Sequence, residues 1–315
     1  MHGDVPKRNC WRTVMSEAIP SKARLALLPD RGVVSVTGPD ARAFLDNLIT
    51  NDMGLLDHQE AIHAGLLTPQ GKILFAFFVV KSPAGYLLET SLDKTAELAK
   101  RLALYKLRAR IEIKDAAGDV VVAVSLGDIR ARPPGAIVFV DPRSERLGDR
   151  LLIPAPLVGD VVAKMAALRM PPGAITAHRI GAGVPEAGED YALGDTFPHE
   201  ADMDLCHGVS FTKGCFVGQE VVARMQNQTV VRKRVVQVTG AAPLTRGAAV
   251  EVGTAEIGRV GSVAGNAALA MLRLDRVAEA IDKGQAITAG GVALDVDAAA
   301  LDRYRQGVAD KASQR

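Results

Sequence analysis

The sequence is poor in aromatic residues and in cysteine, and neither sign of charge prevails. Aromatic residues make up 4% of the 315 residues, which argues against stacking platforms for single-stranded nucleic acid. With 38 basic and 36 acidic residues the net charge is +2, so the whole chain has no bias toward polyanions. Nucleic acid is therefore not an expected partner. At 48% hydrophobic and 23% charged, the composition indicates a folded chain of two or three domains.

The three cysteines are too few and too scattered for a disulfide framework. Cys10, Cys206 and Cys215 are also one thiolate short of a standard four-cysteine iron–sulfur site. Cys206 and His207 followed by Cys215, even with His199 added, do not have the spacing of a zinc site. No resident metal is expected.

Long hydrophobic runs are absent as well. No uninterrupted apolar stretch approaches the length of a membrane span, and residues 1–20 lack the apolar core of a signal peptide. These absences predict a cytoplasmic protein in a reducing compartment, without membrane attachment. Residues 1–20 are expected to form a flexible extension, and Met15 is a candidate natural start.

Strands and helices alternate through the first two thirds of the chain. The predicted strands are 25–28, 32–36, 64–67, 73–80, 86–90, 111–113, 120–124, 137–140 and 151–153. Apolar residues at helical spacing predict helices at 40–50, 93–104 and 157–170, the last broken by a Pro-Pro-Gly sequence. This order favours an α+β architecture of two similar sheet-and-helix modules.

The basic run 232–234 could bind a polyanion or simply be solvated. After this run the sequence pattern changes. Short strands at 235–238, 248–252, 256–264, 267–272 and 292–296 are separated by Gly, Pro and Asn. Their spacing predicts a small β-barrel over residues 229–300. Residues 301–315 are mostly polar and are expected to form a tail.

A glycine-bracketed cysteine stands out at KGCFVGQEVVAR, which runs from Lys213 to Arg224. It follows a long irregular connection, residues 179–200, of a kind that is often functional. Gly214 and Gly218 allow a tight turn and a close approach of backbone amides to a ligand. A short helix is expected from Gly218, which puts Cys215 near a helix N-terminus with Lys213 beside it. Both neighbours would stabilise a thiolate.

A buried, purely structural role for Cys215 is the competing interpretation, since free cysteines are among the most buried residues. The polar residues Lys213, Gln219, Glu220 and Arg224 surround the same turn. A turn that only reversed the chain would not need them. They favour a thiol that reacts or contacts a ligand.

This stretch resembles the signature of the YgfZ family, and the resemblance extends from about Leu25 to about Leu274. That family is similar to the T-protein, the aminomethyltransferase of the glycine cleavage system, and is folate-binding. It supports the assembly or repair of iron–sulfur clusters. The resemblance implies a T-protein-like folate-binding fold over residues 21–228, with two sheet-and-helix modules around a central cavity. It also implies tetrahydrofolate or a derivative as the cofactor.

The resemblance further implies a set of folate-binding residues. Glu200, which ends a Phe-Pro-His-Glu sequence, resembles the T-protein carboxylate that accepts both N–H groups of the pterin edge. A solvated loop glutamate is the alternative. Asn51 and Asp52 resemble a pocket-lining stretch or form a plain helix stop. Tyr105 and Arg108 would contact the middle or the tail of a folate, or would form an ordinary amphipathic edge.

One departure from the T-protein affects the expected chemistry. The T-protein carries an acidic residue, needed for aminomethyl transfer, where this chain has Phe75 and Ala76. An apolar side chain cannot replace a general acid or a charge stabiliser. The chain is therefore expected to be an accessory protein rather than a classical enzyme. It would bind tetrahydrofolate and support iron–sulfur clusters through Lys213 and Cys215, in transient contact with client enzymes or assembly proteins.

Two alternatives remain at this point. The first is a folate-dependent aminomethyl or one-carbon transferase, which would need another acid in the pocket, and Asp52 is the candidate. The second is a folate-sensing regulator or a partner in tRNA modification, because related folate modules occur there. The near-neutral charge and the shortage of aromatic residues weaken direct RNA binding.

Overall fold

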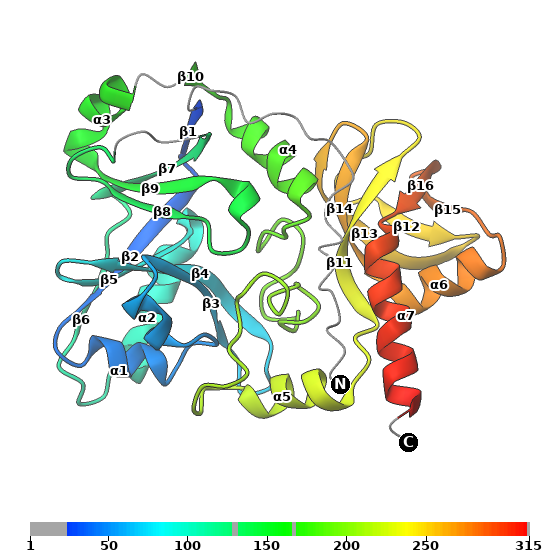
Figure 1. Ribbon diagram of the computed structural model, residues 1–315, viewed down its shortest axis with the longest axis horizontal. Coiled ribbons are helices and arrows are strands. Elements are labelled where there is room, and N and C mark those ends of the chain that lie inside the picture. The colour runs from blue at the N-terminus through cyan, green and yellow to red at the C-terminus, as the bar shows by residue number, and fades with distance from the viewer. Residues whose placement is uncertain (1–23, 128–131, 166–167, 314–315) are drawn as a thin grey trace, which may run out of the picture.

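The computed structural model describes residues 24–127, 132–165 and 168–313, which form two five-stranded sheets and a closed barrel (Figure 1). The expected N-terminal extension, with Cys10 and Met15, lies outside the described residues. None of the helices within the described ranges is both long and apolar enough to cross a membrane. The predicted α+β architecture is confirmed.

The first sheet is covered on one face by two helices. Its strand order is β3 (Ala61–Leu67), β4 (Ile73–Ser82), β5 (Gly85–Ser91), β2 (Arg31–Thr37) and β6 (Glu112–Asp115). The helices are α1 (Ala41–Asp46) and α2 (Thr95–Tyr105). Phe44 and Leu45 of α1 and Leu98 and Leu102 of α2 share one buried core with the strands. The helical spacing of these residues is what made both helices predictable.

The second sheet packs against the first. Its strand order is β10 (Leu168–Arg169), β1 (Arg24–Leu28), β7 (Val120–Leu126), β9 (Asp149–Pro154) and β8 (Ile137–Val140). Phe78 and Val33 of the first sheet share a core with Val122 and Phe139 of the second. Helix α3 (Val158–Met165) covers the outer face through Val161. The two modules therefore form one packed body.

A helix occupies part of the connection that was expected to be irregular. The predicted helix 157–170 ends as α3 at Met165, and α4 (Pro172–Ala182) begins at the second proline. Proline is well suited to the first turn of a helix, because the missing N–H would have no partner there. Helix α4 ends at Gly183, which has φ +70°. The sequence pattern predicts only that these prolines end a helix, not that one of them begins the next.

The C-terminal barrel is confirmed. It closes in the order β11 (Lys233–Gly240), β14 (Ala267–Arg273), β13 (Ala255–Ala264), β12 (Ala249–Val252), β15 (Ile287–Ala289) and β16 (Val292–Val296). Helix α6 (Leu274–Asp282) adds four buried residues to it. The expected tail is instead helix α7 (Ala298–Ser313). Ala300 and Leu301 are buried in the barrel core and Tyr304 packs against it, so three residues in a mostly polar stretch dock this helix.

Buried polar contacts join the barrel to the rest of the fold. Asp190 accepts hydrogen bonds from the Ser262 amide of β13 (2.7 Å) and from Arg179 of α4 (2.6 Å). Arg179 also donates to the Ser262 hydroxyl (2.6 Å). Ser262 lies where the register of β13 shifts against β14, between Val260 and Val263. This irregularity exposes the amide that Asp190 binds.

The basic run forms a second connection to the barrel. Arg234 at the start of β11 binds Asp202 and Asp204, each at 2.7 Å, and the His199 carbonyl at 2.6 Å. It is therefore neither a solvated charge nor part of a polyanion site. Arg234 lies between the two carboxyl groups and opposes the effect of burial, which still raises the pKa of Asp202 to about 7.

Gly261 should be intolerant of a side chain. A Cβ atom at this position would lie 2.6 Å from Asp190 Oδ1 and 3.0 Å from the Glu189 carbonyl oxygen. We expect Gly261→Ala to lower the free energy of unfolding by about 1–3 kcal/mol, as overpacking does, measured by urea titration. Gly118→Ala is the control, because nothing lies within 4 Å of a Cβ there. Equal stabilities of the two variants would contradict the close packing of β13 against Asp190.

Candidate functional site

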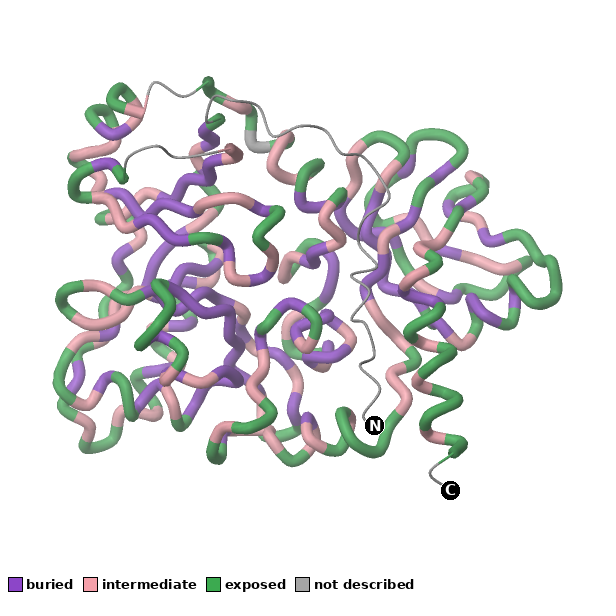
Figure 2. Tube along the Cα trace, viewed as in Figure 1, coloured by how far each residue is buried: buried purple, intermediate pink, exposed green. Residues whose placement is uncertain are grey.

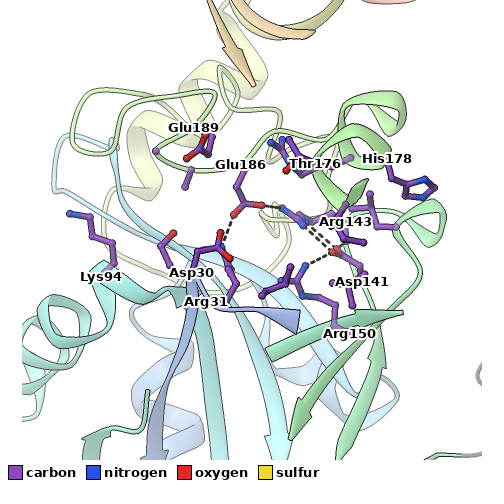
Figure 3. Close-up of a pocket in the computed structure, with 18 of the residues that line it drawn as sticks. Asp30, Arg31, Lys94, Asp141, Arg143, Arg150, Thr176, His178, Glu186 and Glu189 are labelled. Atoms are coloured by element: carbon purple, nitrogen blue, oxygen red, sulfur yellow. Dashed lines mark hydrogen bonds and ion pairs between the residues drawn. The ribbon is translucent and has the colours of Figure 1, made fainter. Parts of the chain in front are cut away.

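A cavity of about 450 Å³ lies where the two sheets meet α4 and the loop that follows it (Figure 3). Its lining comes from β1, β2, β5, β7 and β9, from the segment between β8 and β9, from α4 and from the loop after α4. The volume is in the range of small-molecule sites. The resemblance to the T-protein implies a central cavity, and this cavity lies between the two modules.

Six charged side chains form a closed ring at the inner wall of the cavity. Around the ring run Arg31, Glu89, Arg150, Asp141, Arg143 and Glu186, and each side chain is paired with the next and the last with the first. The N–O distances lie between 2.6 Å and 3.1 Å. Figure 3 shows the part of the ring that faces the cavity. The ring joins both sheets and the loop after α4.

The ring keeps its carboxylates ionised. Burial by itself would raise the pKa of Glu89, Asp141 and Glu186, but the neighbouring guanidinium groups outweigh it and hold each pKa below its usual range. All three groups are therefore negative at neutral pH, and the three arginines balance them. The ring offers no acidic proton to a substrate.

Aromatic and imidazole groups lie beneath the ring. The guanidinium carbons of Arg143 and Arg150 lie 4.9 Å and 4.6 Å from the centre of the Phe78 ring, which is cation–π geometry. Burial, with the charge of Arg143, lowers the pKa of His63 to about 4. His63 is thus neutral, and its Nδ1–H donates to the Cys206 carbonyl at 3.1 Å. It has no acid–base role near pH 7.

Glu186 is the ring carboxylate that a ligand can reach. Its side chain is 21% exposed, whereas the Glu89 and Asp141 side chains are almost fully buried. Each Glu186 oxygen accepts from one guanidinium, of Arg31 or Arg143, so each keeps a second lone pair. The backbone amide of Glu186 donates to the Asp190 carboxylate at 2.8 Å. This bond fixes the backbone from which the Glu186 side chain projects. Glu186 can therefore accept two adjacent N–H donors.

The structure does not bring the five predicted folate ligands to this cavity. None of Glu200, Asn51, Asp52, Tyr105 and Arg108 is among the described residues that line it. The Glu200 carboxylate instead accepts the amide of Phe197 at 3.0 Å, within its own turn. Glu200, which resembles the pterin-binding carboxylate of the T-protein, therefore has a structural role in its own turn.

Asn51 and Asp52 organise the chain after α1. The Asn51 amide donates to the carbonyls of His63 (2.7 Å) and His207 (2.8 Å), and its oxygen accepts from Asp52 N. The Asp52 carboxylate accepts from Gly54 N at 2.7 Å and caps the 3₁₀ helix Met53–Asp57. These contacts correspond to the helix-stop alternative. Both side chains are engaged within the protein.

Lys213 is a clamp between the signature and α1. Its ammonium contacts the carbonyls of Asp46, Asn51 and Ile49 at 2.5, 2.8 and 3.1 Å, and the Asp46 carboxylate at 3.2 Å. The side chain is 2% exposed. Burial lowers the pKa of Lys213 below its ordinary value, although Asp46 opposes this. The ammonium is thus held by backbone carbonyls, which gives it a structural role in addition to the predicted one.

The signature cysteine is exposed, whereas Cys206 is buried. The buried alternative for Cys215 is therefore wrong, and it describes Cys206, whose pKa burial raises to about 12. Helix α5 (Gln219–Gln228) begins after Gly218 as predicted. Gly218 has φ +82° and packs against the β3–β4 turn, whereas a Cβ on Gly214 would meet nothing within 4 Å. The loop that carries Cys215, residues 213–218 (the cysteine loop), is therefore accessible to a partner.

The polar residues Glu220 and Arg224 of the signature are accessible, whereas Phe216 and Val222 are buried. The Gln219 side chain accepts from the Phe216 amide at 3.3 Å, and Glu220 and Arg224 are exposed on α5. No group of three or more histidine, cysteine or acidic side chains that could hold a metal occurs among the described residues. Within that part of the chain, Cys215 alone would supply a single thiolate to any metal cargo.

Comparison with known proteins decides the family. The chain is 30% identical to the human "Iron-sulfur cluster assembly factor IBA57, mitochondrial" over 282 residues, which cover 79% of this chain and 77% of that protein. The chain belongs to the IBA57 family. The homologue of Mycosarcoma maydis is 35% identical over 232 residues, which cover 69% of this chain and 57% of that protein. The chain spans 57% and 59% of the Mycosarcoma maydis and Neurospora crassa relatives.

Two further comparisons concern the fold. The family model "CAF17, C-terminal beta-barrel domain" matches residues 232–300, which agrees with the closed barrel. The crystal structure of the glycine cleavage system aminomethyltransferase T from Bartonella henselae superposes with a TM-score of 0.71. It has 17% identity and covers 88% of this chain and 86% of that one. The predicted T-protein-like fold is confirmed.

The comparisons also correct the sequence analysis. The IBA57 relatives are named as mitochondrial proteins, so the expectation of a cytoplasmic protein is wrong. That expectation used only the absence of a hydrophobic signal, which says nothing about other targeting signals. These relatives carry the name IBA57, and membership of the YgfZ family stays a prediction from the signature.

Sequence reasoning missed the charge ring. Its members come from five separate stretches between residues 31 and 186, and no motif joins them. One signal was available: the acidic, glycine-rich connection that was singled out at 179–200 contains Glu186. A second was Glu89, a carboxylate inside the otherwise uncharged strand β5, where burial without a partner would be costly.

Removing the Lys213 ammonium should loosen the signature. In Lys213→Met the carbonyls of Asp46, Ile49 and Asn51 lose a charged donor, so we expect the free energy of unfolding to fall by about 2 kcal/mol. Urea titration measures the change, and hydrogen exchange should show faster opening of residues 210–216. Lys164→Met, at an exposed position on α3, is the control. A Lys213→Met protein as stable as that control would refute the clamp.

Proposed function

We propose that this chain is an accessory protein in the assembly or repair of iron–sulfur clusters in client enzymes, and that it binds a tetrahydrofolate in the central cavity. The assembly role is carried by one observation, the relationship to proteins named iron–sulfur cluster assembly factor IBA57. The partners would be client enzymes or other assembly proteins. The cavity and the exposed cysteine loop give this role two distinct places on the molecule.

The donor set of the cavity suits a folate. The aminopyrimidinone edge of a pterin presents adjacent N–H donors, and the ionised Glu186 has a lone pair free on each oxygen. Lys94 and His178 lie on opposite sides of Glu186 in Figure 3. Lys94, which is 34% exposed, can meet the carboxylates of the glutamate tail. In this proposal the pterin-binding role moves from Glu200 to Glu186.

Cys215 would act at the surface, away from the folate. The cysteine loop is not part of the cavity lining, and Cys215 is exposed. One thiolate cannot hold a cluster, because clusters are bound by sets of cysteine or histidine ligands. A cluster that met Cys215 would therefore need its other ligands from the client or the assembly partner. Because those ligands belong to another protein, the contact between Cys215 and a cluster would be transient.

The transferase alternative finds little support at the cavity. Ala76 and Phe77 line a small hollow that also contains Arg31, Arg143 and Glu186, and Phe75 is buried in the core. The stretch where the T-protein carries its acid thus adjoins the ligand space but has no carboxylate. Asp52, the substitute named above, caps a 3₁₀ helix outside the lining. The acid that the T-protein uses for transfer therefore has no counterpart in this stretch.

Paired substitutions test the folate site. We expect Glu186→Gln to weaken binding of tetrahydrofolate, or of its 5-formyl or 5,10-methylene form, by about tenfold or more, since a charged hydrogen-bond partner is lost. Glu200→Gln should leave the affinity unchanged. Anaerobic calorimetric titration measures both, and circular dichroism verifies folding. A loss with Glu200→Gln alone would return the pterin to the predicted position, and no binding by the wild type would remove the folate from the proposal.

A second experiment tests the assembly role. In cells that depend on this protein, Cys215→Ala should lower the activities of iron–sulfur enzymes without lowering protein abundance, because the side chain is exposed and packs in no core. Cys215→Ser separates the thiol from its shape and should fail in the same way. Arg224→Ala, at another exposed signature position, shows whether the loss is particular to the thiol. Normal iron–sulfur enzyme activities with Cys215→Ala would refute the role of this residue.

A further inference from the structure

The C-terminal end of α2 carries exposed leucines among unpaired basic side chains. We propose that this α2 corner is the docking surface for an acidic protein segment with apolar side chains, presented by the iron–sulfur partner. The identity of the partner rests on the function proposed above, whereas the chemistry of the surface does not. The α2 corner consists of Lys100, Arg101, Leu104, Tyr105, Lys106, Leu107 and Arg108.

Its apolar part is the most exposed of the described chain. Leu104 is 65% exposed and Leu107 is 90% exposed, the two highest values among the large hydrophobic side chains that the structure describes. Leu104 lies on the last turn of α2, and Leu107 lies two residues beyond its end at Tyr105. Single exposed leucines are ordinary, but this pair forms one projecting apolar point.

The backbone at Leu107 is left-handed, directly after the C-cap of α2. Its φ is +44°, in the left-handed region that costs an ordinary residue about 1–2 kcal/mol and glycine almost nothing. At 90% exposure the side chain buries almost no area that would offset this cost within the fold. A left-handed residue directly after the C-cap is a common way to end a helix, so the exposed leucine side chain, rather than the backbone, is what this position adds to the surface.

The charges around the leucines are left unpaired. Within the described ranges no carboxylate forms an ion pair or a hydrogen bond with any of the four basic side chains of the corner. Arg110, just beyond it, is by contrast paired with Asp40 at 2.9 Å. The corner is therefore a local excess of positive charge on a nearly neutral protein. Guanidinium groups bind carboxylates in a bidentate manner, so the complementary surface is acidic.

The α2 corner lies on the side of the molecule that carries the cysteine loop. Tyr105, inside the corner, and Val217, just after Cys215, both pack against the core beneath α1 and α2. Lys213 fastens the loop to the end of α1, and Figure 1 shows α1 and α2 on the same side of the first sheet. A segment docked on the corner would place its protein along the face on which Cys215 is exposed.

Other occupants fit less well. A second copy of this chain docked through the same corner would oppose four positive charges to four positive charges. Two leucines bury too little apolar area for a stable hold on a membrane. Nucleic acid would take the charges but not the leucines, and the corner offers a single tyrosine for stacking. An acidic segment with apolar side chains satisfies both features.

Cross-linking from the corner tests the proposal. A benzoylphenylalanine in place of Leu107 should cross-link in cells to an iron–sulfur protein, and peptide mapping should place the link in a segment rich in Asp or Glu with neighbouring apolar residues. The paired change Arg101→Glu and Arg108→Glu should lower the yield about tenfold, through repulsion of that segment. The same cross-linker at Leu168, which is 59% exposed on β10, is the control. Equal products from both positions, or links only to lipid, nucleic acid or a second copy, would overturn the proposal.

A second variant separates docking from folding and from the proposed function. Leu107→Asn removes the leucine but suits a left-handed backbone, so it should not lower the melting temperature while iron–sulfur enzyme activities fall. If Cys215→Ala lowers those activities and Leu107→Asn does not, the docking surface is refuted and the assembly role stands. If Cys215→Ala has no effect, the proposed role of Cys215 fails, and the acidic or non-acidic nature of the cross-linked segment still decides the docking proposal.

Discussion

The closed ring of three arginines and three carboxylates is the interaction on which the arrangement of the two sheets depends. Arg31 and Glu89 come from the first sheet, Arg150 from the second, and Glu186 from the loop after α4. Each member has two partners, so removal of any one leaves buried charges uncompensated, which is far more costly than the net gain of an exposed ion pair. The same contacts that hold the sheets together form the inner wall of the cavity.

The ring continues into the barrel through one residue. The Glu186 amide is bound by Asp190, and Asp190 is bound by Ser262 of β13 and by Arg179 of α4. The most accessible carboxylate of the ring is therefore held from two sides. A loop residue can therefore present a carboxylate in a fixed orientation. The backbone of Glu186 is held by Asp190, which is bound to the barrel, and its two carboxylate oxygens are held by two arginines.

The signature forms a separate centre with a different construction. Lys213 is buried against backbone carbonyls, while Cys215 and Gly214 face outward. A rigid base with an exposed thiol is what a surface-acting group needs, because the loop must stay in place while a partner approaches. The cavity and the cysteine loop thus divide the proposed function between a small molecule and a protein.

The sequence by itself determined the two modules, the barrel, the helix after Gly218 and the absence of an acid at Phe75 and Ala76, because each follows from patterns within a few neighbouring residues. It did not reveal helix α7, whose few apolar residues matter only once a barrel surface is there to receive them. Nor did it reveal that Glu186, rather than Glu200, lines the cavity. The ring is built from side chains far apart in the sequence, and only the packing of the two sheets decided which charges would meet.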